Sequence, residues 1–399
     1  MDRRTREIAF LAGIVYFTQG ALGIAGIALP LYLRGLGWSV SEITTISSVV
    51  AFPWVIKILY GLLSDCLPLL KYRRKSYLVL FACASTLGWG GLALLAADRW
   101  IIISAMIVSN LGLAATDVIT DGFIVEHSKG EKSHIFQSVA WGTRSVGAIL
   151  SGFAGGWLAE HWEARYVFMI AALLPLITVG VAFRLREIRI KKKTFLSFVD
   201  PFRRCLRLLL EHNLRWFILL IVLSQVASSF GLPFFFHMKE NLLFRESFLG
   251  LLISVGWAGV VIASLIYARW LRKLPPPTIL RWAFLCAAAN ILSTLLIRDR
   301  MTALVLVFLG GMLACITLLP ILSISALLTY RSGVEGTLFA VLMSIHNLGQ
   351  ISFGFIGGRL YNRVGLETLI FFSAAISLLA MLFISKLRFE DAEGAHHGP

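Results

Sequence analysis

The sequence predicts an all-α membrane protein with twelve transmembrane helices, arranged as two bundles of six. Hydrophobic residues make up 58% of the 399 residues and charged residues only 15%, whereas an ordinary soluble domain carries roughly 25% charged residues. Apolar stretches long enough to cross the hydrocarbon core, which is about 30 Å thick, recur along the whole chain. The second half of the chain also repeats the pattern of the first.

The apolar stretches divide the chain into twelve predicted spans of about 18 to 26 residues each. The first stretch is too long for the apolar region of a signal peptide and no cleavage site follows it, so we expect it to remain as a span. The first and seventh spans both close at a Leu-Pro pair, Leu29-Pro30 and Leu232-Pro233. The predicted spans are residues 8–33, 43–64, 76–96, 100–122, 135–159, 165–184, 214–238, 247–268, 279–297, 301–328, 337–361 and 366–386.

Basic residues are concentrated in alternate connections between these spans. With the N-terminus placed inside, 26 of the 37 Lys and Arg residues fall in inside segments and 9 in outside segments. This asymmetry follows the positive-inside rule and predicts that both termini are cytoplasmic. The net charge of +15 therefore reflects membrane topology, and we expect no nucleic-acid partner. A bacterial inner membrane and a monomer are the expected setting.

The longest polar interval separates the two predicted bundles. We expect a first bundle over residues 1–184, a basic linker over 185–213, a second bundle over 214–386 and a cytoplasmic tail over 387–399.

Asp200-Pro201 is a typical helix start within the linker, because Asp caps a helix and Pro suits its first position. The predicted helix has an apolar side and a basic side, so it could lie on the anionic inner leaflet; the alternative is a solvated hinge. Its apolar residues are Phe202, Leu206, Leu209 and Leu210, and its basic residues are Arg203, Arg204 and Arg207.

The two halves share a repeat at a fixed offset of 202 residues, in segments 139–158 and 341–360. A parallel six-plus-six duplication is typical of the major facilitator architecture, whose site lies between the halves near the bilayer midplane. Small-residue spacing lets helix backbones approach closely, which suits either sliding bundles or static packing. The matching residues include Val139, Gly147, Gly152, Phe153, Gly155, Gly156 and Leu158, which correspond to Val341, Gly349, Gly354, Phe355, Gly357, Gly358 and Leu360.

Four charged residues lie within predicted spans: Lys57, Asp117, Asp121 and Arg144. Charge at membrane depth is costly and is usually retained for function. Asp117 and Asp121 are four residues apart and share a helix face, so they repel each other and lose hydration, which favours a bound proton on one of them. We expect them to couple transport to protons. The alternative is a structural quartet in which both acids pair with Lys57 and Arg144.

Arg144 and several polar or aromatic residues are candidates for substrate binding. Arg144 offers a planar fork that matches a carboxylate. Lys57 could extend outward to the membrane surface, but its depth favours inward pairing. The other candidates are Gln19, Trp54, Trp141, Gln225, His346 and Asn347. Tryptophans stack flat rings but often only fill space between helices, and single polar residues often only join helices.

The loop after the second span contains a candidate gate. Asp65 ends that span and a basic cluster with Arg73 and Arg74 follows. An acid beside basic residues could latch the cytoplasmic side, although a basic cluster at this place also satisfies topology alone.

No phosphate-binding loop, metal-ligand spacing or paired nucleophile and base occurs, so we expect neither a cofactor nor a metal nor enzyme activity. The five cysteines are scattered along the chain.

Several stretches of the chain carry a resemblance to a known family. They are residues 54–57, 60–65, 72–78, 116–118, 121–122, 125–126, 137–138, 141–142, 247–250, 333–340 and 343–345. On these stretches the chain resembles the folate–biopterin transporter family of the major facilitator superfamily. That resemblance implies a twelve-helix carrier for folates or pterins that is driven by protons, and it matches the family's charged residues at Lys57, Asp65, Asp117, Asp121 and Arg144. The chain departs from the family in its short loops and at His346, where a smaller polar residue is expected.

The sequence thus predicts a proton-coupled secondary transporter for a folate, a pterin or a related organic anion. The alternatives are a muropeptide permease or siderophore exporter of the same superfamily, and a membrane sensor or scaffold that moves no solute.

Overall fold

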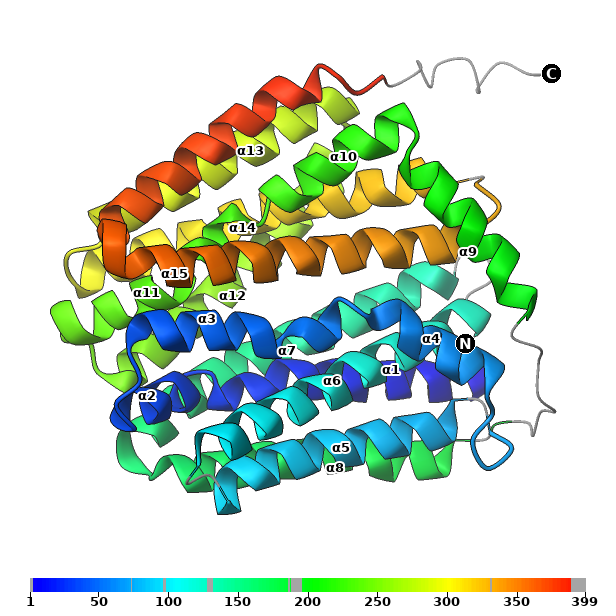
Figure 1. Ribbon diagram of the computed structural model, residues 1–399, viewed down its shortest axis with the longest axis horizontal. Coiled ribbons are helices and arrows are strands. Elements are labelled where there is room, and N and C mark those ends of the chain that lie inside the picture. Colours follow the sequence, from blue (N-terminus) through cyan, green and yellow to red (C-terminus); the bar gives the residue numbers. More distant parts are fainter. Residues whose placement is uncertain are drawn as a thin grey trace.

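The structure is a computed structural model, and it describes residues 3–72, 74–95, 98–127, 132–185, 187, 196–330 and 332–388. These residues form helices, with one isolated β-bridge between Leu69 and Tyr72. Helices of the first half, drawn in blue to teal, form one bundle, and helices of the second half, drawn in green to red, form the other (Figure 1).

The first half contains α1 (Arg3–Ala21), η1 (Leu22–Ala25), α2 (Ala28–Gly35), α3 (Val40–Val50), η2 (Phe52–Trp54), α4 (Lys57–Cys66), α5 (Lys75–Leu94), α6 (Arg99–His127), α7 (Lys132–His161) and α8 (Ala164–Arg184). The linker helix is α9 (Leu196–Leu209). The second half contains α10 (His212–Leu223), η3 (Val226–Ser229), α11 (Gly231–Phe236), η4 (His237–Asn241), α12 (Glu246–Arg269), η5 (Leu271–Lys273), α13 (Pro276–Ser293), η6 (Thr294–Leu296), α14 (Arg300–Thr329) and α15 (Glu335–Ile384).

The helices agree with the predicted all-α membrane fold. Among the residues that the structure describes, ten segments are long and apolar enough to cross a membrane. One of them, Glu335–Ile384, is two helices that meet at Gly365, whose φ of 77° interrupts the helical backbone. The 30-residue helix α7, which is not among the ten, lies beside α1 and α12. This arrangement is consistent with twelve spans.

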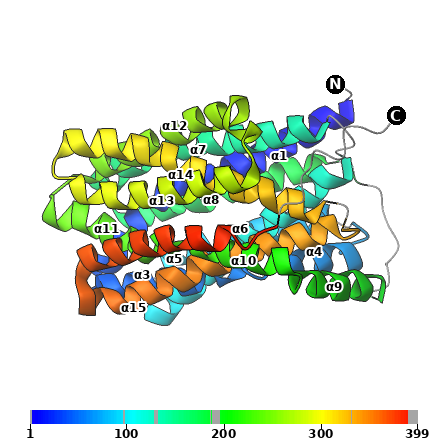
Figure 2. The ribbon, with the colours of Figure 1, turned by 90° about the horizontal axis from the view of Figure 1, so that it is seen from above.

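The ends of the bundle are distinct. The start of α1, the end of α4 and α9 lie together at one end, which we call the α9 end (Figures 1 and 2). The opposite end carries α2 and α11 and is called the α2 end.

Close backbone contacts join the two halves in the part nearer the α2 end. A Cβ added to Gly156 of α7 would lie 2.7 Å from the Cα of Gly250 on α12. A Cβ added to Gly358 of α15 would lie 2.8 Å from the backbone nitrogen of Thr45 on α3. The close helix approach predicted from the glycine spacing is therefore present, and it joins the bundles to each other.

The linker helix differs from its prediction. It begins at Leu196 rather than at Asp200, because a local cap signal is a weak preference that helical residues upstream can override. Cys205 is fully buried against the second bundle, where Leu209 also packs. Leu206 and Leu210, assigned to the same apolar side as Leu209, are exposed.

Candidate functional site

A break in the second span positions the first polar residues of the site. The helix stops at Val50, passes through η2 with Pro53, and resumes at Lys57. Pro53 lacks an N–H, and broken backbone at membrane depth is tolerated only where other groups satisfy it or a cavity lies beside it. Asn347 of α15 satisfies this break by donating from Nδ2 to the Trp54 carbonyl at 2.9 Å. The break therefore joins the two halves beside Lys57.

Asp117 is the centre of a charged cluster from three helices. Its Oδ2 accepts from Lys57 Nζ at 2.6 Å, and its Oδ1 accepts from Gln19 Nε2 at 2.8 Å. Asp117 is only 4% exposed. The predicted inward pairing of Lys57 is therefore present, with α1, α4 and α6 each contributing one residue.

Asp121 lies one turn further along α6 and has a different partner. Tyr16 of α1 donates its hydroxyl to Asp121 Oδ1 at 2.6 Å. Sequence reasoning missed Tyr16. Its spacing of three residues from Gln19 on a helix was the available signal, because that spacing puts both on one face. The two carboxylates thus differ: Lys57 neutralises Asp117, while the hydrogen bond found for Asp121 comes from a neutral hydroxyl.

Arg144 lies close to this cluster but does not join it as an ion pair. Its guanidinium carbon is 5.2 Å from the centre of the Trp141 ring. It lies within electrostatic range of both aspartates. Within the described part of the chain, it makes neither a hydrogen bond nor a salt bridge. The structural quartet that would have paired Arg144 with an aspartate is therefore absent from these residues.

The second half contributes His346 and Asn347 opposite Lys57. His346 is close enough to Lys57 to interact electrostatically. Its Nε2 is buried and has no hydrogen-bond partner among the described residues. The interhelical hydrogen bond considered as the alternative for His346 is therefore not seen at this atom, and a buried polar atom without a partner calls for an explanation such as a ligand or water.

Gln225 and Trp54 are placed less favourably for contact with a substrate. Gln225 donates to Ser224 Oγ at 2.9 Å, and its Cγ would lie 3.3 Å from a Cβ added to Gly349. Trp54 donates from Nε1 to Asn110 Oδ1 at 3.0 Å. Lys57 Nζ lies 4.7 Å from the centre of the Trp54 ring, in a cation–aromatic contact. Trp141 is 39% exposed and already faces Arg144. The structure thus brings Gln19, Trp54, Lys57, Asp117, His346 and Asn347 into one connected group, with Arg144 and Trp141 beside it.

The predicted cytoplasmic gate is described only at Arg74, since Arg73 and the side chain of Asp65 lie outside the described residues. The backbone nitrogen of Arg74 donates to Glu187 Oε1 at 2.9 Å, and its guanidinium lies 5.9 Å from the Phe123 ring centre. These contacts tie the loop to α6 and to the linker, on the side of the first half.

Ionic contacts between the halves occur instead at the α2 end, where sequence reasoning did not expect them. Arg34 pairs with Glu240 at 2.7 Å. Glu160 accepts from the Ser247 backbone nitrogen at 3.0 Å and lies 3.7 Å from Arg245. No spacing signal marks these residues, because their loops meet only when the two bundles close on each other. We call Arg34, Glu160, Glu240 and Arg245 the α2-end latch.

The described residues include no group of three or more His, Cys, Asp or Glu side chains that could hold a metal ion.

Comparison with known proteins agrees with the geometry. The family model described as the BT1 family matches residues 19–387. A folate-biopterin transporter from Synechocystis sp. is 31% identical over 390 residues, which cover 92% of this chain and 77% of that protein. A probable folate-biopterin transporter 4 from Arabidopsis thaliana is 26% identical and covers 95% of this chain and 93% of its own length.

Solved structures identify the fold. The nucleoside transporter NupG aligns with a TM-score of 0.74 at 12% identity, over 98% of this chain and 100% of that one. A D-xylose-proton symporter aligns with a TM-score of 0.73 at 13% identity, over 97% and 98% of the two chains. The match to the family model and the similarity to the Synechocystis protein together show that this chain belongs to the BT1 family, and that it is a multi-pass membrane transporter of the major facilitator fold rather than an enzyme.

Proposed function

We propose that this protein is a proton-coupled secondary transporter that moves a folate, a pterin or a related organic anion by alternating access. The observation that carries the proposal is the Arg144 guanidinium, which lies beside a carboxylate already neutralised by Lys57 and has no acidic partner of its own among the described residues. The names of the relatives supply the class of solute.

Arg144 is the proposed anchor for a substrate carboxylate. An arginine side chain stays charged and presents two parallel donors to a carboxylate. The Trp141 ring supports one face of the guanidinium, so the side chain is held in place before the substrate arrives. Gln19, His346 and Asn347 line the same region, and the free Nε2 of His346 is available to a polar group of the substrate.

Asp121 is the proposed proton carrier. Asp117 has a cation as its partner, so its negative charge is balanced. Asp121 accepts from Tyr16, which supplies no positive charge. A largely buried carboxylate that has no ion pair of its own is less costly when it carries a proton. Release of that proton would place a second negative charge beside Arg144, where it competes with the substrate anion.

Closure at the α2 end corresponds to one state of alternating access. Lys and Arg are most frequent in the segments that the sequence places inside, and the start of α1 and α9 from these segments lie at the α9 end, so we propose that this end faces the cytoplasm, with both termini inside, in a bacterial inner membrane. We also propose that residues 1–184 and 214–386 move as two bundles around the 185–213 linker, within a monomer.

Breaking the α2-end latch is expected to favour opening at that end. Arg34→Ala removes an exposed ion pair, which contributes about 1 kcal/mol at most, so the population open at the α2 end should rise about five-fold or less. Distances between spin labels on α2 and η4 would report the change. Arg99→Ala is the control, because Arg99 pairs with Glu42 at 2.8 Å within the first half. Equal opening in both variants would contradict a specific role for the latch.

Transport by the purified protein in proteoliposomes tests the proposed function. Labelled folate and biopterin would be offered with and without an imposed proton gradient, beside an anhydro-muropeptide and a ferric siderophore. We expect concentrative uptake of a folate or pterin only when the gradient is present. If only the muropeptide or the siderophore were transported, that solute would take the place of folate and pterin as the assigned substrate. The absence of transport for every solute would overturn the proposal.

A further inference from the structure

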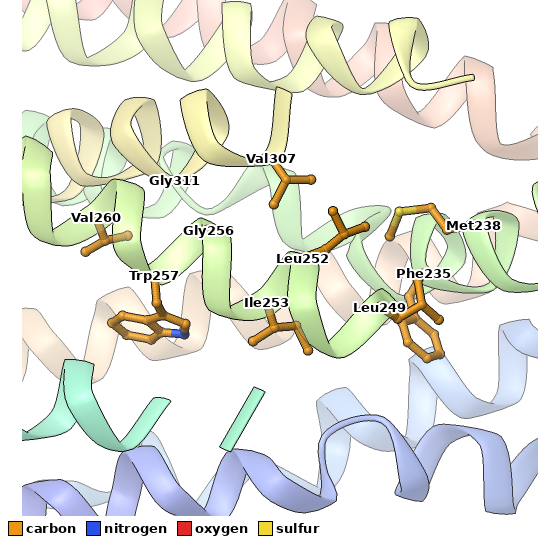
Figure 3. Close-up of a pocket in the computed structure, with 10 residues that line it drawn as sticks. All are labelled: Phe235, Met238, Leu249, Leu252, Ile253, Gly256, Trp257, Val260, Val307 and Gly311. Carbon is orange, nitrogen blue, oxygen red and sulfur yellow. The ribbon is translucent and has the colours of Figure 1, made fainter. Parts of the chain in front are cut away.

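The second half contains an apolar cavity of about 290 Å³ between α11, α12 and α14 (Figure 3). Its lining includes Phe235, Met238, Ile253, Trp257, Val307 and Gly311, and none of its ten lining residues is charged. None of these residues takes part in the polar cluster described above. The cavity is therefore a separate surface whose chemistry is apolar.

The walls of the cavity are fixed by backbone contact. Gly311 of α14 lies directly against the backbone of Gly256 on α12. A Cβ added to Gly259 would lie 3.1 Å from the backbone nitrogen of Met312, one turn further along the same contact. Helices that touch through glycine cannot be drawn closer to fill the space, so the cavity is a built feature of the fold.

The cavity faces the first bundle. Figure 3 shows Ile253 and Trp257 on one side of α12, pointing toward the blue and teal helices of the first half. Ile262 and Leu265 lie on another side of α12 and are 43% and 66% exposed, as expected for contact with lipid. The cavity therefore opens toward the interface between the bundles, where transporters of this fold bind their substrates.

Helix pairing places the cavity at the depth of Arg144. Ser254 Oγ donates to the Ile149 carbonyl at 2.7 Å, and the Gly156–Gly250 contact shows that α7 and α12 run antiparallel. Arg144 precedes Ile149 by five residues, or about 7.5 Å along the helix axis. Trp257 follows Ser254 by three residues, or about 4.5 Å in the same direction. The two side chains thus lie within about 3 Å of the same level, on opposite bundles.

We propose that this cavity is the subsite for an uncharged benzene-type ring of the substrate, whose carboxylate Arg144 holds. The inference rests on the proposed function and specifies which part of the substrate is recognised. A pterin ring carries many hydrogen-bonding groups, and an apolar wall would leave them unpaired at considerable cost. A benzene ring has no such groups, and an apolar cavity of about 150 Å³ is already enough to bind benzene. In a folate, the aminobenzoyl ring lies next to the glutamate carboxylates, which matches this arrangement.

The subsite is tested by equilibrium binding to the purified full chain, with pairs of anions that differ by a ring. The pairs are p-aminobenzoyl-glutamate against glutamate, and 4-phenylbutyrate against butyrate. Wild-type protein should bind the member with the ring at least about ten-fold more tightly. Trp257→Ala should remove about ten-fold of that preference while leaving the ring-free anion unchanged. Trp282→Ala is the control, since Trp282 is 52% exposed on α13.

A second variant guards against a merely structural effect of Trp257→Ala. Val307→Phe fills the cavity and removes no aromatic contact, so it should also abolish the preference for the ring. The subsite proposal would be overturned if both variants kept the wild-type preference for the anion with the ring. It would also be overturned if the wild-type protein showed no such preference. This result is independent of folate transport. If folate fails to move while phenylbutyrate binds through Trp257, the substrate proposal fails and the ring subsite stands.

Discussion

Arg144→Ala is expected to weaken binding of a carboxylate substrate by roughly 100-fold, because truncating one partner of a desolvated, hydrogen-bonded charge pair typically costs 2–5 kcal/mol. Arg144 has no salt bridge among the described residues, so its loss leaves no orphaned acid and the fold should persist. Isothermal titration calorimetry with folate and with p-aminobenzoyl-glutamate would measure the change in dissociation constant. Arg144→Lys keeps the charge but loses the planar fork, so it should fall between wild type and alanine.

Arg359 offers a matched control for this variant. Its guanidinium carbon lies 5.4 Å from the Phe355 ring centre, in a cation–aromatic contact like that of Arg144 with Trp141. Arg359→Ala should leave binding unchanged. Wild-type affinity in Arg144→Ala would remove this residue from the binding site and with it the anion-anchor mechanism.

Asp121→Asn is expected to abolish proton-driven accumulation while exchange of substrate across the membrane continues. The amide oxygen still accepts from Tyr16, so the local fold is retained, but the side chain can no longer take up and release a proton. Uptake into proteoliposomes should then fall to the level of downhill equilibration and lose its dependence on an imposed proton gradient. Gradient-dependent accumulation by Asp121→Asn would contradict its role as the proton carrier.

Asp117→Asn tests whether the loss of stability and the loss of transport at this position can be separated. It leaves the partly buried Lys57 without its ion pair, and breaking a fully buried pair typically costs 3–5 kcal/mol, so the loss here is about 3 kcal/mol at most. We therefore expect a lower melting temperature in detergent together with loss of transport. The double variant Lys57→Met with Asp117→Leu should recover much of the stability without recovering transport.

The transmembrane fold and the repeat were accessible from sequence because they depend on length, composition and spacing. A stretch of about 20 apolar residues must form a helix in lipid, since no other local structure satisfies its backbone. The spacing of Gly156 and Gly358 likewise predicted close contacts between helices, and the structure has them. The charged residues Lys57, Asp117, Asp121 and Arg144 stood out because charge is rare at that depth.

Partner choice within the site was not accessible from sequence. Asp117 could have paired with Lys57 or with Arg144, and the break before Lys57 decided the outcome by resuming the helix beside α6. Tyr16 reached Asp121 from 105 residues away. Gln225, a predicted substrate residue, forms its hydrogen bond with neighbouring Ser224 instead.

The sequence by itself determined a two-bundle membrane transporter with ionisable residues in its first half, because hydrophobic length and internal repetition are visible in the order of the residues without any knowledge of their contacts. Only the tertiary structure decided which cation neutralises which acid, which end of the molecule is latched, and at what depth the apolar cavity of the second half lies. Those features depend on side chains from different helices meeting within a few ångströms, and residues far apart in sequence meet only after the helices have packed.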